Sequence, residues 1–244
     1  MKRVNFFVVC MLILLCFFIA KEGDSSYALV QVSAIKVDTY NSDRKVAYLT
    51  FDDGPSKRVT PKVLDILDKY DIRASFFVIG SKVKEYPEIL RQEYEAGHFI
   101  GNHTFSHKNG KIYRSKESFL EEIEETDKAI EEALEIENFK CKIFRFPNGS
   151  VSKSYAYEKK LCQGYLDEIG YKYIDWNALN NDSIRKYSNE QLLENLKKTV
   201  NGKSTVIVLM HDSGDVNKTY DVLEASIKFL IDEGFEFRTL YDFI

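Results

Sequence analysis

Two adjacent carboxylates end an apolar segment near the start of the chain. Residues 45–51 are typical of a buried strand, and Asp52 and Asp53 follow them before Gly54-Pro55 stops the strand. Neighbouring residues of an extended segment point to opposite sides, so the two carboxylates can take different roles. One can be a ligand for a metal ion and the other a proton acceptor. The same tetrapeptide is also typical of a simple polar turn, so its interpretation depends on the rest of the chain.

Two of the four histidines, His103 and His107, follow a second apolar segment at residues 99–102. On a helical turn, positions four apart share one face, so both imidazoles can reach one ion. The spacing resembles that of zinc-protease helices, but Thr104 stands where those helices carry a glutamate base. A base must then come from elsewhere, and the Asp52-Asp53 pair is the obvious source. The alternative is a chance spacing of two surface histidines; His98 is predicted to be structural or exposed.

Three further polar groups follow apolar segments. Arg145 lies between two phenylalanines, where its guanidinium needs a carboxylate partner, and the turn at residues 147–149 can present backbone amides to a ligand. Residues 175–177 and 180–182 carry a second group. The third group, His211-Asp212, follows the apolar residues 204–210 at the point where a core would end.

The elements that must position these residues alternate between strands and helices. Thr60-Pro61 is a helix-start pattern, and Ser188 with Gln191 forms a capping-box pattern. The glutamates of a long acidic helix are interpreted as a solvated face. Strands are predicted at residues 45–51, 74–79, 99–102, 142–146, 171–178, 204–210 and 235–239, and helices at 60–70, 87–97, 116–135, up to 170, 188–200 and 221–233. This alternation predicts an α/β fold with a parallel sheet, either open or closed into a barrel.

The polar groups follow the first, third, fourth, fifth and sixth predicted strands. In β/α folds, the loops after the carboxyl ends of parallel strands meet at one face, where active sites form. Five polar groups on one face are hard to explain as a chance distribution of surface residues. We therefore expect the Asp52-Asp53 turn to belong to an active site.

The N-terminus has the pattern of an export signal. Lys2 and Arg3 precede an apolar run at residues 6–20, and a small-x-small sequence ends at Ala28. We expect a signal peptide or uncleaved anchor at residues 1–28, a polar stalk at 29–44 and the catalytic domain at 45–244. The protein is then secreted or attached to the cell surface. A net charge of -4 gives no basic surface for nucleic acid. Cys141 and Cys162 are expected either to form a disulfide or to be buried free thiols.

Residues 46–244 resemble the polysaccharide deacetylases, the NodB-homology enzymes of carbohydrate esterase family 4. Four of the five family motifs carry the resemblance: residues 50–55, His103-Thr104-x-x-His107, Arg145-x-Pro147-x-Gly149 and Leu209-x-His211-Asp212. The resemblance implies a single catalytic domain with a distorted (β/α)7 barrel. It also implies an N-acetylated polysaccharide as partner, with no stable protein partner.

The resemblance also implies a role for each matching residue. Asp53, His103 and His107 would hold a divalent metal, usually zinc. Asp52 would be the general base, oriented by Arg145, and His211 the general acid. The remaining implied contacts are those of the Asn148 backbone N–H with the oxyanion, of Leu209 with the acetyl group and of Trp176 with the substrate.

The chain departs from the family at two motifs. Asn148 stands where the family often has an aromatic residue. The fourth motif, Asp-x-x-Asp-Trp, has no literal match, so either Asp175 or Asp182 can be the carboxylate that supports His211. We favour Asp182 because it lies beyond the predicted strand, on the active face.

The resulting hypothesis is a secreted, metal-dependent N-deacetylase whose substrate is N-acetylglucosamine of peptidoglycan. One alternative is an esterase acting on O-acetylated xylan or a similar glycan. A second alternative is a catalytically inactive carbohydrate-binding module.

Overall fold

Strand β1, Lys45–Asp52, lies at the centre of a parallel sheet and is buried from Val46 onward. The computed structural model describes residues 34–41, 43–214 and 218–244. Strand β7, Thr205–His211, pairs with β1 along its length. Strands β2, Ser75–Val78, and β8, Phe235–Arg238, pair with the second and first halves of β1. The residues predicted to be a signal peptide lie outside the described residues.

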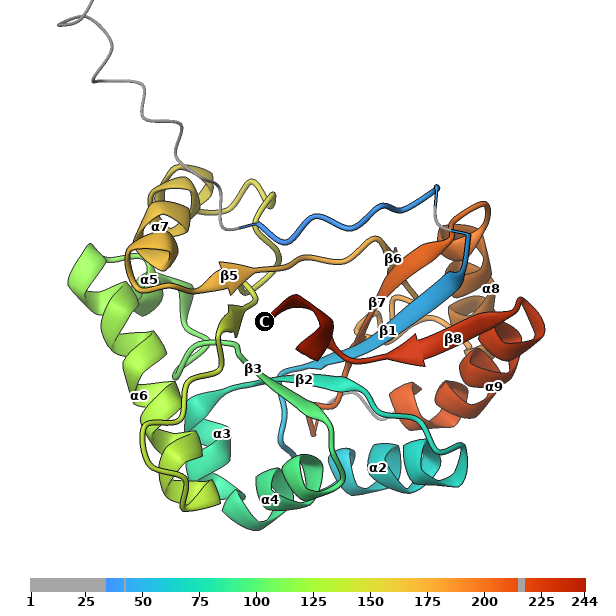
Figure 1. Cartoon of the computed structure of the whole chain (residues 1–244), viewed down its shortest axis with the longest axis horizontal. Coiled ribbons are helices and arrows are strands. Elements are labelled where there is room, and N and C mark those ends of the chain that lie inside the picture. The colour runs from blue at the N-terminus through green and yellow to red at the C-terminus, as the bar shows by residue number, and fades with distance from the viewer. Residues whose placement is uncertain (1–33, 42, 215–217) are drawn as a thin grey trace, which may run out of the picture. The chain divides into compact units, whose positions relative to one another are not determined.

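The other strands extend the sheet on both sides of β1. They are β3 (Phe99–Asn102), β4 (Ile143–Phe144), β5 (Lys172–Tyr173) and β6 (Ala178–Leu179). The order is β5-β4-β3-β2-β1-β7-β6, and every pairing is parallel. The sheet curls into an incomplete barrel, because β5 and β6 do not pair with each other within these ranges (Figure 1). The predicted α/β class and distorted barrel are confirmed.

Helices cover the outside of the curled sheet (Figure 1). The capping box of α8 forms as predicted, with Ser188 as N-cap, and Pro61 stands in the first turn of α2. The short helices α3 and α5 were not predicted. The helices are α2 (Thr60–Lys69), α3 (Gly80–Glu85), α4 (Pro87–Glu95), α5 (Asn109–Ile112), α6 (Lys116–Leu134), α7 (Ala156–Glu168), α8 (Asn189–Val200) and α9 (Lys218–Asp232).

Alternating residues of β1 separate two hydrophobic clusters. Ala47, Leu49 and Phe51 belong to the large cluster that also contains the buried residues of the helices. Val46 and Tyr48 belong to a smaller cluster that includes Leu240 of the C-terminal 3-10 helix, Leu240–Phe243. Because side chains of a strand alternate between faces, Thr50 and Asp52 continue the row of Val46 and Tyr48 toward the carboxyl end.

The predicted strand at residues 171–178 is two short strands, β5 and β6. Asn177 lies between them and bonds to β7 through its side chain. Its Nδ2 donates to Thr205 O at 2.9 Å, and its Oδ1 accepts from Ile207 N at 2.8 Å. A side-chain amide therefore replaces part of the backbone pairing, which the apolar pattern of the segment does not indicate.

The first described residues pack on the folded unit. Ala34 forms a parallel bridge with Tyr173 of β5, and Ser204 N donates to Thr39 O at 2.8 Å. These contacts attach part of the predicted stalk to the sheet. Among the residues that the structure describes, none of the helices is both long and apolar enough to span a membrane.

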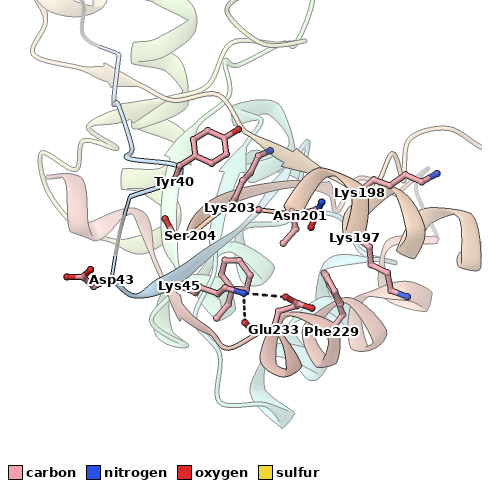
Figure 2. Close-up of a pocket in the computed structure, with 13 residues that line it drawn as sticks. Tyr40, Asp43, Lys45, Lys197, Lys198, Asn201, Lys203, Ser204, Phe229 and Glu233 are labelled. Atoms are coloured by element: carbon pink, nitrogen blue, oxygen red, sulfur yellow. Dashed lines mark hydrogen bonds and ion pairs between the residues drawn. The ribbon is translucent and has the colours of Figure 1, made fainter.

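A pocket of about 680 Å³ opens where β1, β7 and β8 begin (Figure 2). Two of its cations bond to nearby backbone carbonyls: Lys45 Nζ lies 2.8 Å from Glu233 O, and Lys203 Nζ lies 2.5 Å from Thr199 O. The polar groups singled out by the sequence follow the carboxyl ends of the strands and do not line this pocket. The chemistry therefore has to be sought at the other ends of the strands.

Candidate active site

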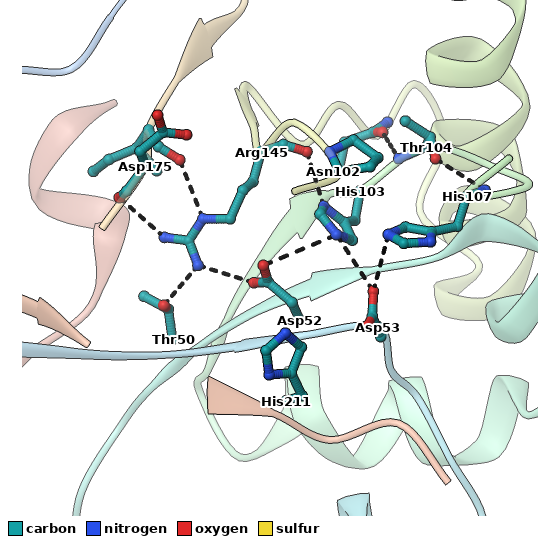
Figure 3. A network of polar contacts seen from close by, with 12 residues as sticks. Thr50, Asp52, Asp53, Asn102, His103, Thr104, His107, Arg145, Asp175 and His211 are labelled. Atoms are coloured by element: carbon teal, nitrogen blue, oxygen red, sulfur yellow. Dashed lines mark hydrogen bonds and ion pairs between the residues drawn. The ribbon is translucent and has the colours of Figure 1, made fainter. Parts of the chain in front are cut away.

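The carboxyl ends of four strands bring the predicted residues together (Figure 3). Asp52 ends β1, and His211, its register partner, ends β7. His103 follows β3 and Arg145 follows β4. The common parallel direction of these strands places all four side chains at one end of the curled sheet.

Asp53, His103 and His107 form a cluster with the composition of a metal site. One ligand atom of each residue lies within 4.8 Å of the other two. Asp53 Oδ1 is 3.4 Å from His103 Nε2 and 3.2 Å from His107 Nε2. Ligand atoms bound at 2.0–2.2 Å around one tetrahedral ion lie about 3.4 Å apart. The observed separations match that spacing.

The hydrogen bonds around the cluster leave its ligand atoms available to a cation. His103 Nδ1 lies 2.8 Å from the carbonyl oxygen of Arg145, which only accepts, so this nitrogen carries the hydrogen. In the neutral imidazole, Nε2 then directs a lone pair at the cluster. Asp53 Oδ1 is buried and has no hydrogen-bond partner among the described residues. One carboxylate oxygen and two imidazole nitrogens that converge in this way fit a divalent metal ion.

The two histidines lie on a loop, so the predicted helical turn is wrong. Thr104 and His107 have φ values of 71° and 54°, which no right-handed helix contains. Glu122 of α6 holds the loop: its carboxylate accepts from Phe105 N at 3.0 Å and from Ser106 N at 2.7 Å. The loop brings the imidazoles onto one side without the helical i, i+4 geometry.

Glu122 also corrects the interpretation of the acidic helix. Its side chain is fully buried, takes a hydrogen bond from Ser106 Oγ at 2.9 Å and lies 3.0 Å from Lys111 Nζ. The sequence reasoning missed this residue because Glu121, Glu124 and Glu125 surround it with the same charge. The one available signal was its position one residue before the apolar Ile123.

Arg145 is fully buried and directs its guanidinium at Asp52. Its Nη1 donates to Asp52 Oδ1 at 2.9 Å and to Thr50 Oγ1 at 2.6 Å, and its Nε donates to Ile174 O at 3.1 Å. The guanidinium carbon lies 4.0 Å from the centre of the Phe77 ring. These contacts fix the Asp52 carboxylate and provide the counter-charge for it in a buried position.

Asp52 has its other oxygen turned toward the cluster. Its Oδ2 lies 3.9 Å from His103 Nε2, beyond hydrogen-bond distance. One carboxylate oxygen is therefore held by Arg145, and the other is available beside the candidate metal site. This arrangement suits a proton acceptor.

His211 is paired with Asp182. Its Nδ1 lies 2.7 Å from Asp182 Oδ1, while Asp182 Oδ2 accepts from His211 N at 2.8 Å and from Thr219 Oγ1 at 2.7 Å. Burial alone lowers the pKa of His211, but the hydrogen bond and charge of Asp182 outweigh it and raise the pKa to about 9. At neutral pH His211 is a cation that can donate a proton.

Asp175, the alternative partner of His211, is bound elsewhere. Its carboxylate accepts from Ser150 N at 2.9 Å and from Ser150 Oγ at 2.5 Å. It therefore holds the loop after β4, in which Asn148 has a φ of 62° and an exposed side chain.

The remaining predicted contact residues lie beside this loop and β1. Trp176 packs on Gly149, whose added Cβ would be 3.0 Å from the indole ring. Leu209 pairs in register with Thr50 and is 7% exposed, so little of its side chain is open to a ligand in this structure.

Asp212, which the sequence analysis pairs with His211, makes contacts that the sequence did not indicate. Its Oδ2 accepts from Thr60 Oγ1 at 2.5 Å, and its backbone oxygen accepts from Ser56 Oγ at 2.6 Å. A Cβ on Gly54 would be 2.1 Å from Asp212 Oδ2. Asp212 therefore packs directly against the turn that carries Asp53 and joins it to the start of α2.

A groove of about 480 Å³ gives access to the cluster. Asp53 and His107 lie in its wall. Three cationic side chains also line it, from Lys57, Arg58 and Lys82. The groove connects the candidate metal ligands with solvent.

Comparisons with known proteins show similarity over most of the chain. Residues 39–166 match the family described as Polysaccharide deacetylase. A peptidoglycan-N-acetylglucosamine deacetylase, PgdA, of Listeria monocytogenes is 33% identical over 91% of this chain and 43% of its own length. A peptidoglycan-N-acetylglucosamine deacetylase of Bacillus cereus is 30% identical over 83% of this chain and 90% of its own length.

A solved structure agrees with the fold. The catalytic domain of a peptidoglycan N-acetylglucosamine deacetylase from Eubacterium rectale superposes with a TM-score of 0.74 at 31% identity. The match covers 84% of this chain and 92% of that domain. By contrast, the chain spans less than half of the Listeria relative, so that relative contains further sequence that has no counterpart in the match.

Proposed function

Because the chain belongs to the polysaccharide deacetylase family, we propose that it is an exported, metal-dependent hydrolase that removes N-acetyl groups from a cell-wall polysaccharide. The proposed substrate is N-acetylglucosamine of peptidoglycan, which the names of the Listeria and Bacillus cereus relatives specify for those proteins. The observation that carries the proposal is the convergence of a metal-type cluster with two titratable groups, Asp52 and His211. Each of them is bound by a partner of opposite charge, Asp52 by Arg145 and His211 by Asp182.

Asp53, His103 and His107 would hold the metal, and Zn²⁺ suits a set of one oxygen and two imidazole nitrogens. When bound there, the metal supplies Lewis acidity, which polarises the acetamide carbonyl and acidifies water. The chain's own groups carry the proton transfers.

Asp52 is proposed as the general base. Arg145 occupies one of its oxygens, and the other faces the cluster, where the attacking water would lose its proton. The backbone N–H of Asn148 is proposed to donate to the negatively charged oxygen that develops on the acetamide.

His211 is proposed as the general acid. As the C–N bond breaks, the departing amine must gain a proton, and the imidazolium held by Asp182 supplies it. Water adds hydroxide to the acetyl carbon and a proton to the sugar nitrogen, so the products are acetate and a free amine. Leu209 and Trp176 are proposed to contact the acetyl group and the sugar.

Export is proposed from the basic and apolar residues at the N-terminus, with residues 1–28 as the signal or anchor. The catalytic domain is proposed to include residues 45–244. A cell-wall substrate requires this location, since the polymer lies outside the cytoplasmic membrane.

Acetate release by wild type and an Asp52→Asn variant tests the proposal. Asparagine keeps the size of the side chain but accepts no proton, so acetate release from peptidoglycan should fall about 10²- to 10⁴-fold. Bound metal should remain at the wild-type level. Asp65→Asn, at an exposed position of α2, serves as the control and should behave as wild type.

Equal turnover of wild type and Asp52→Asn would refute the assigned roles. An O-acetylated xylan oligomer is assayed in parallel with peptidoglycan. Acetate from the xylan alone would replace the N-deacetylase proposal with an esterase, and glycan binding without metal or acetate release would indicate an inactive binding module.

A further inference from the structure

We propose that Lys159, a buried residue of α7 that none of the motifs includes, is a positioning residue that turns the Asn148 N–H toward the reacting acetamide. The proposal rests on the proposed deacetylase function and explains how one of its groups is oriented. It concerns the loop after β4, which the sequence indicates only as a polar turn.

The ammonium group of Lys159 in α7 bonds to the loop after β4. The side chain is fully buried, and Nζ donates to Pro147 O at 2.9 Å, to Gly149 O at 2.7 Å and to Ser152 Oγ at 2.6 Å. A lysine ammonium has three hydrogens, so these three acceptors use all of them. All the hydrogen bonds of the ammonium group are thus made to this loop.

The contact with Pro147 O determines where the next amide points. In a trans peptide, the C=O of one residue and the N–H of the next lie in one plane and point in opposite directions. Within the described ranges, the one cis bond is Gly54-Pro55, so the Pro147–Asn148 bond is trans. Because Lys159 pulls Pro147 O toward α7, the Asn148 N–H must point away from α7.

The amide turned in this way is available to a ligand. Its neighbours are engaged: Gly149 N donates to Phe146 O at 2.8 Å, and Ser150 N donates to Asp175. The Asn148 N–H, in contrast, makes no hydrogen bond within the described part of the chain. Helix α7 lies outside the curled sheet (Figure 1). Arg145, three residues before Asn148, bonds to Asp52 at 2.9 Å, so we infer that the amide turned away from α7 faces the site.

Burying the ammonium group of Lys159 is unfavourable in free energy, which indicates that the lysine has a specific role. No carboxylate of the described residues lies within ion-pair distance of its Nζ, and a buried charge with neutral partners is unfavourable. Burial lowers the pKa of Lys159 accordingly, although Asp175 opposes this effect. An apolar side chain would fill the space without that cost, but it would leave the two carbonyls free to rotate.

The test compares Lys159→Met with wild type on N-acetylated peptidoglycan oligomers. Methionine has a similar length and no donor. We expect kcat to fall about 10- to 100-fold, part of the loss that follows removal of a whole oxyanion donor. We expect KM and bound metal to stay within twofold of wild type. Lys160→Met, at the exposed neighbouring position, is the matched control and should retain wild-type kcat.

A folded Lys159→Met variant with wild-type kcat would overturn the proposal. So would a rise of KM with kcat unchanged, because that result indicates a loss of binding without a loss of transition-state stabilisation. Absence of acetate release by wild type would instead overturn the proposed function itself. The two failures are therefore distinguishable.

A second measurement applies where the methionine variant does not fold. Acetate, the product, is added to the ¹⁵N-labelled wild-type protein loaded with Zn²⁺, and the amide spectrum is recorded. A saturable shift of the Asn148 amide proton supports the orientation of this amide that the proposal requires. An unchanged Asn148 resonance at a concentration that shifts other amides of the site overturns it.

Discussion

The two imidazoles that flank Asp52 differ in their Nδ1 partners. His103 Nδ1 faces the backbone carbonyl of Arg145, a neutral acceptor, whereas His211 Nδ1 faces the carboxylate of Asp182. A carbonyl fixes the orientation of a neutral ring, which suits a metal ligand. A carboxylate stabilises the imidazolium, which suits a proton donor. The partner of Nδ1 therefore suits His103 and His211 to different roles.

The pairing of His211 with Asp182 should determine the pH dependence of activity. Asp182 raises the pKa of His211 to about 9, against the opposing effect of burial. The general acid acts only while protonated, so activity should fall as pH rises through this pKa. Asp182→Asn removes the charge and should move the alkaline limb of the kcat/KM profile to lower pH. It should also lower kcat at neutral pH by up to about 10²- to 10⁴-fold.

The measurement is a pH profile of acetate release for both proteins, with Asp65→Asn as control. Asp65 is exposed on α2, so its substitution should leave both limbs in place. An alkaline limb that Asp182→Asn leaves unchanged would show that another group provides the proton.

Single elements position the ligands through partners that are distant in sequence. Glu122 of α6 holds the loop at residues 103–107 through hydrogen bonds. Asp212, the residue after β7, packs against the turn at residues 53–55. Neither Glu122 nor Asp212 is close in sequence to the residues that it contacts. For this reason the i, i+4 spacing of the histidines predicted shared coordination but gave the wrong local conformation.

A second prediction follows from the contacts of Glu122. Glu122→Gln removes the negative charge and keeps one acceptor oxygen for the N–H groups of Phe105 and Ser106, which share Oε2. The new NH2 group would then oppose Lys111 Nζ, which lies 3.0 Å from Oε1. The loop should loosen, and Zn²⁺ affinity should fall about 10- to 100-fold, the usual effect of removing an outer-shell partner. Competition with a chromophoric chelator measures this affinity. Glu121→Gln, one residue earlier and exposed, should bind as wild type; equal affinities of the two variants would contradict the role of Glu122.

A third prediction uses the close approach of Gly54 to Asp212. Gly54→Ala places a Cβ 2.1 Å from the Asp212 carboxylate, which is buried against Thr60. We expect a loss of about 1–3 kcal/mol of unfolding free energy from overpacking. Gly164 lies within α7 with open space around it, so Gly164→Ala should instead stabilise the helix by about 0.5–1 kcal/mol.

Urea unfolding of both glycine variants gives the two free energies. Opposite signs of the two changes are expected. A neutral effect of Gly54→Ala would mean that the turn can move away from Asp212 without cost, and the tight packing would then have no structural role.

At the scale of the whole molecule, much of the site was predictable because parallel topology gathers distant segments at one edge. Once strands were recognised before Asp52, His103, Arg145 and His211, their convergence followed from the common direction of the strands. The residues that were not predictable lack a local pattern. Glu122 stands among other glutamates of α6, and Lys159 stands between Glu158 and Lys160 of α7, so the charge pattern distinguishes neither buried residue from its neighbours.

The alternatives left open by the sequence depended on three-dimensional proximity. Asp182 lies beside His211, whereas Asp175 lies beside Ser150. Cys141 and Cys162 are both buried free thiols, and burial raises the pKa of Cys162 to about 12, so its thiol stays protonated at neutral pH. The fold of the described unit therefore does not depend on a disulfide between these two residues.

The most direct measurement is the metal content and Zn²⁺ affinity of wild type beside Asp53→Ala and His107→Ala. The account predicts one equivalent of bound metal in wild type and loss of tight binding in either variant, with Asp65→Asn unchanged. Wild type without a bound equivalent, or variants that bind Zn²⁺ as tightly as wild type, would contradict a metal site formed by Asp53, His103 and His107.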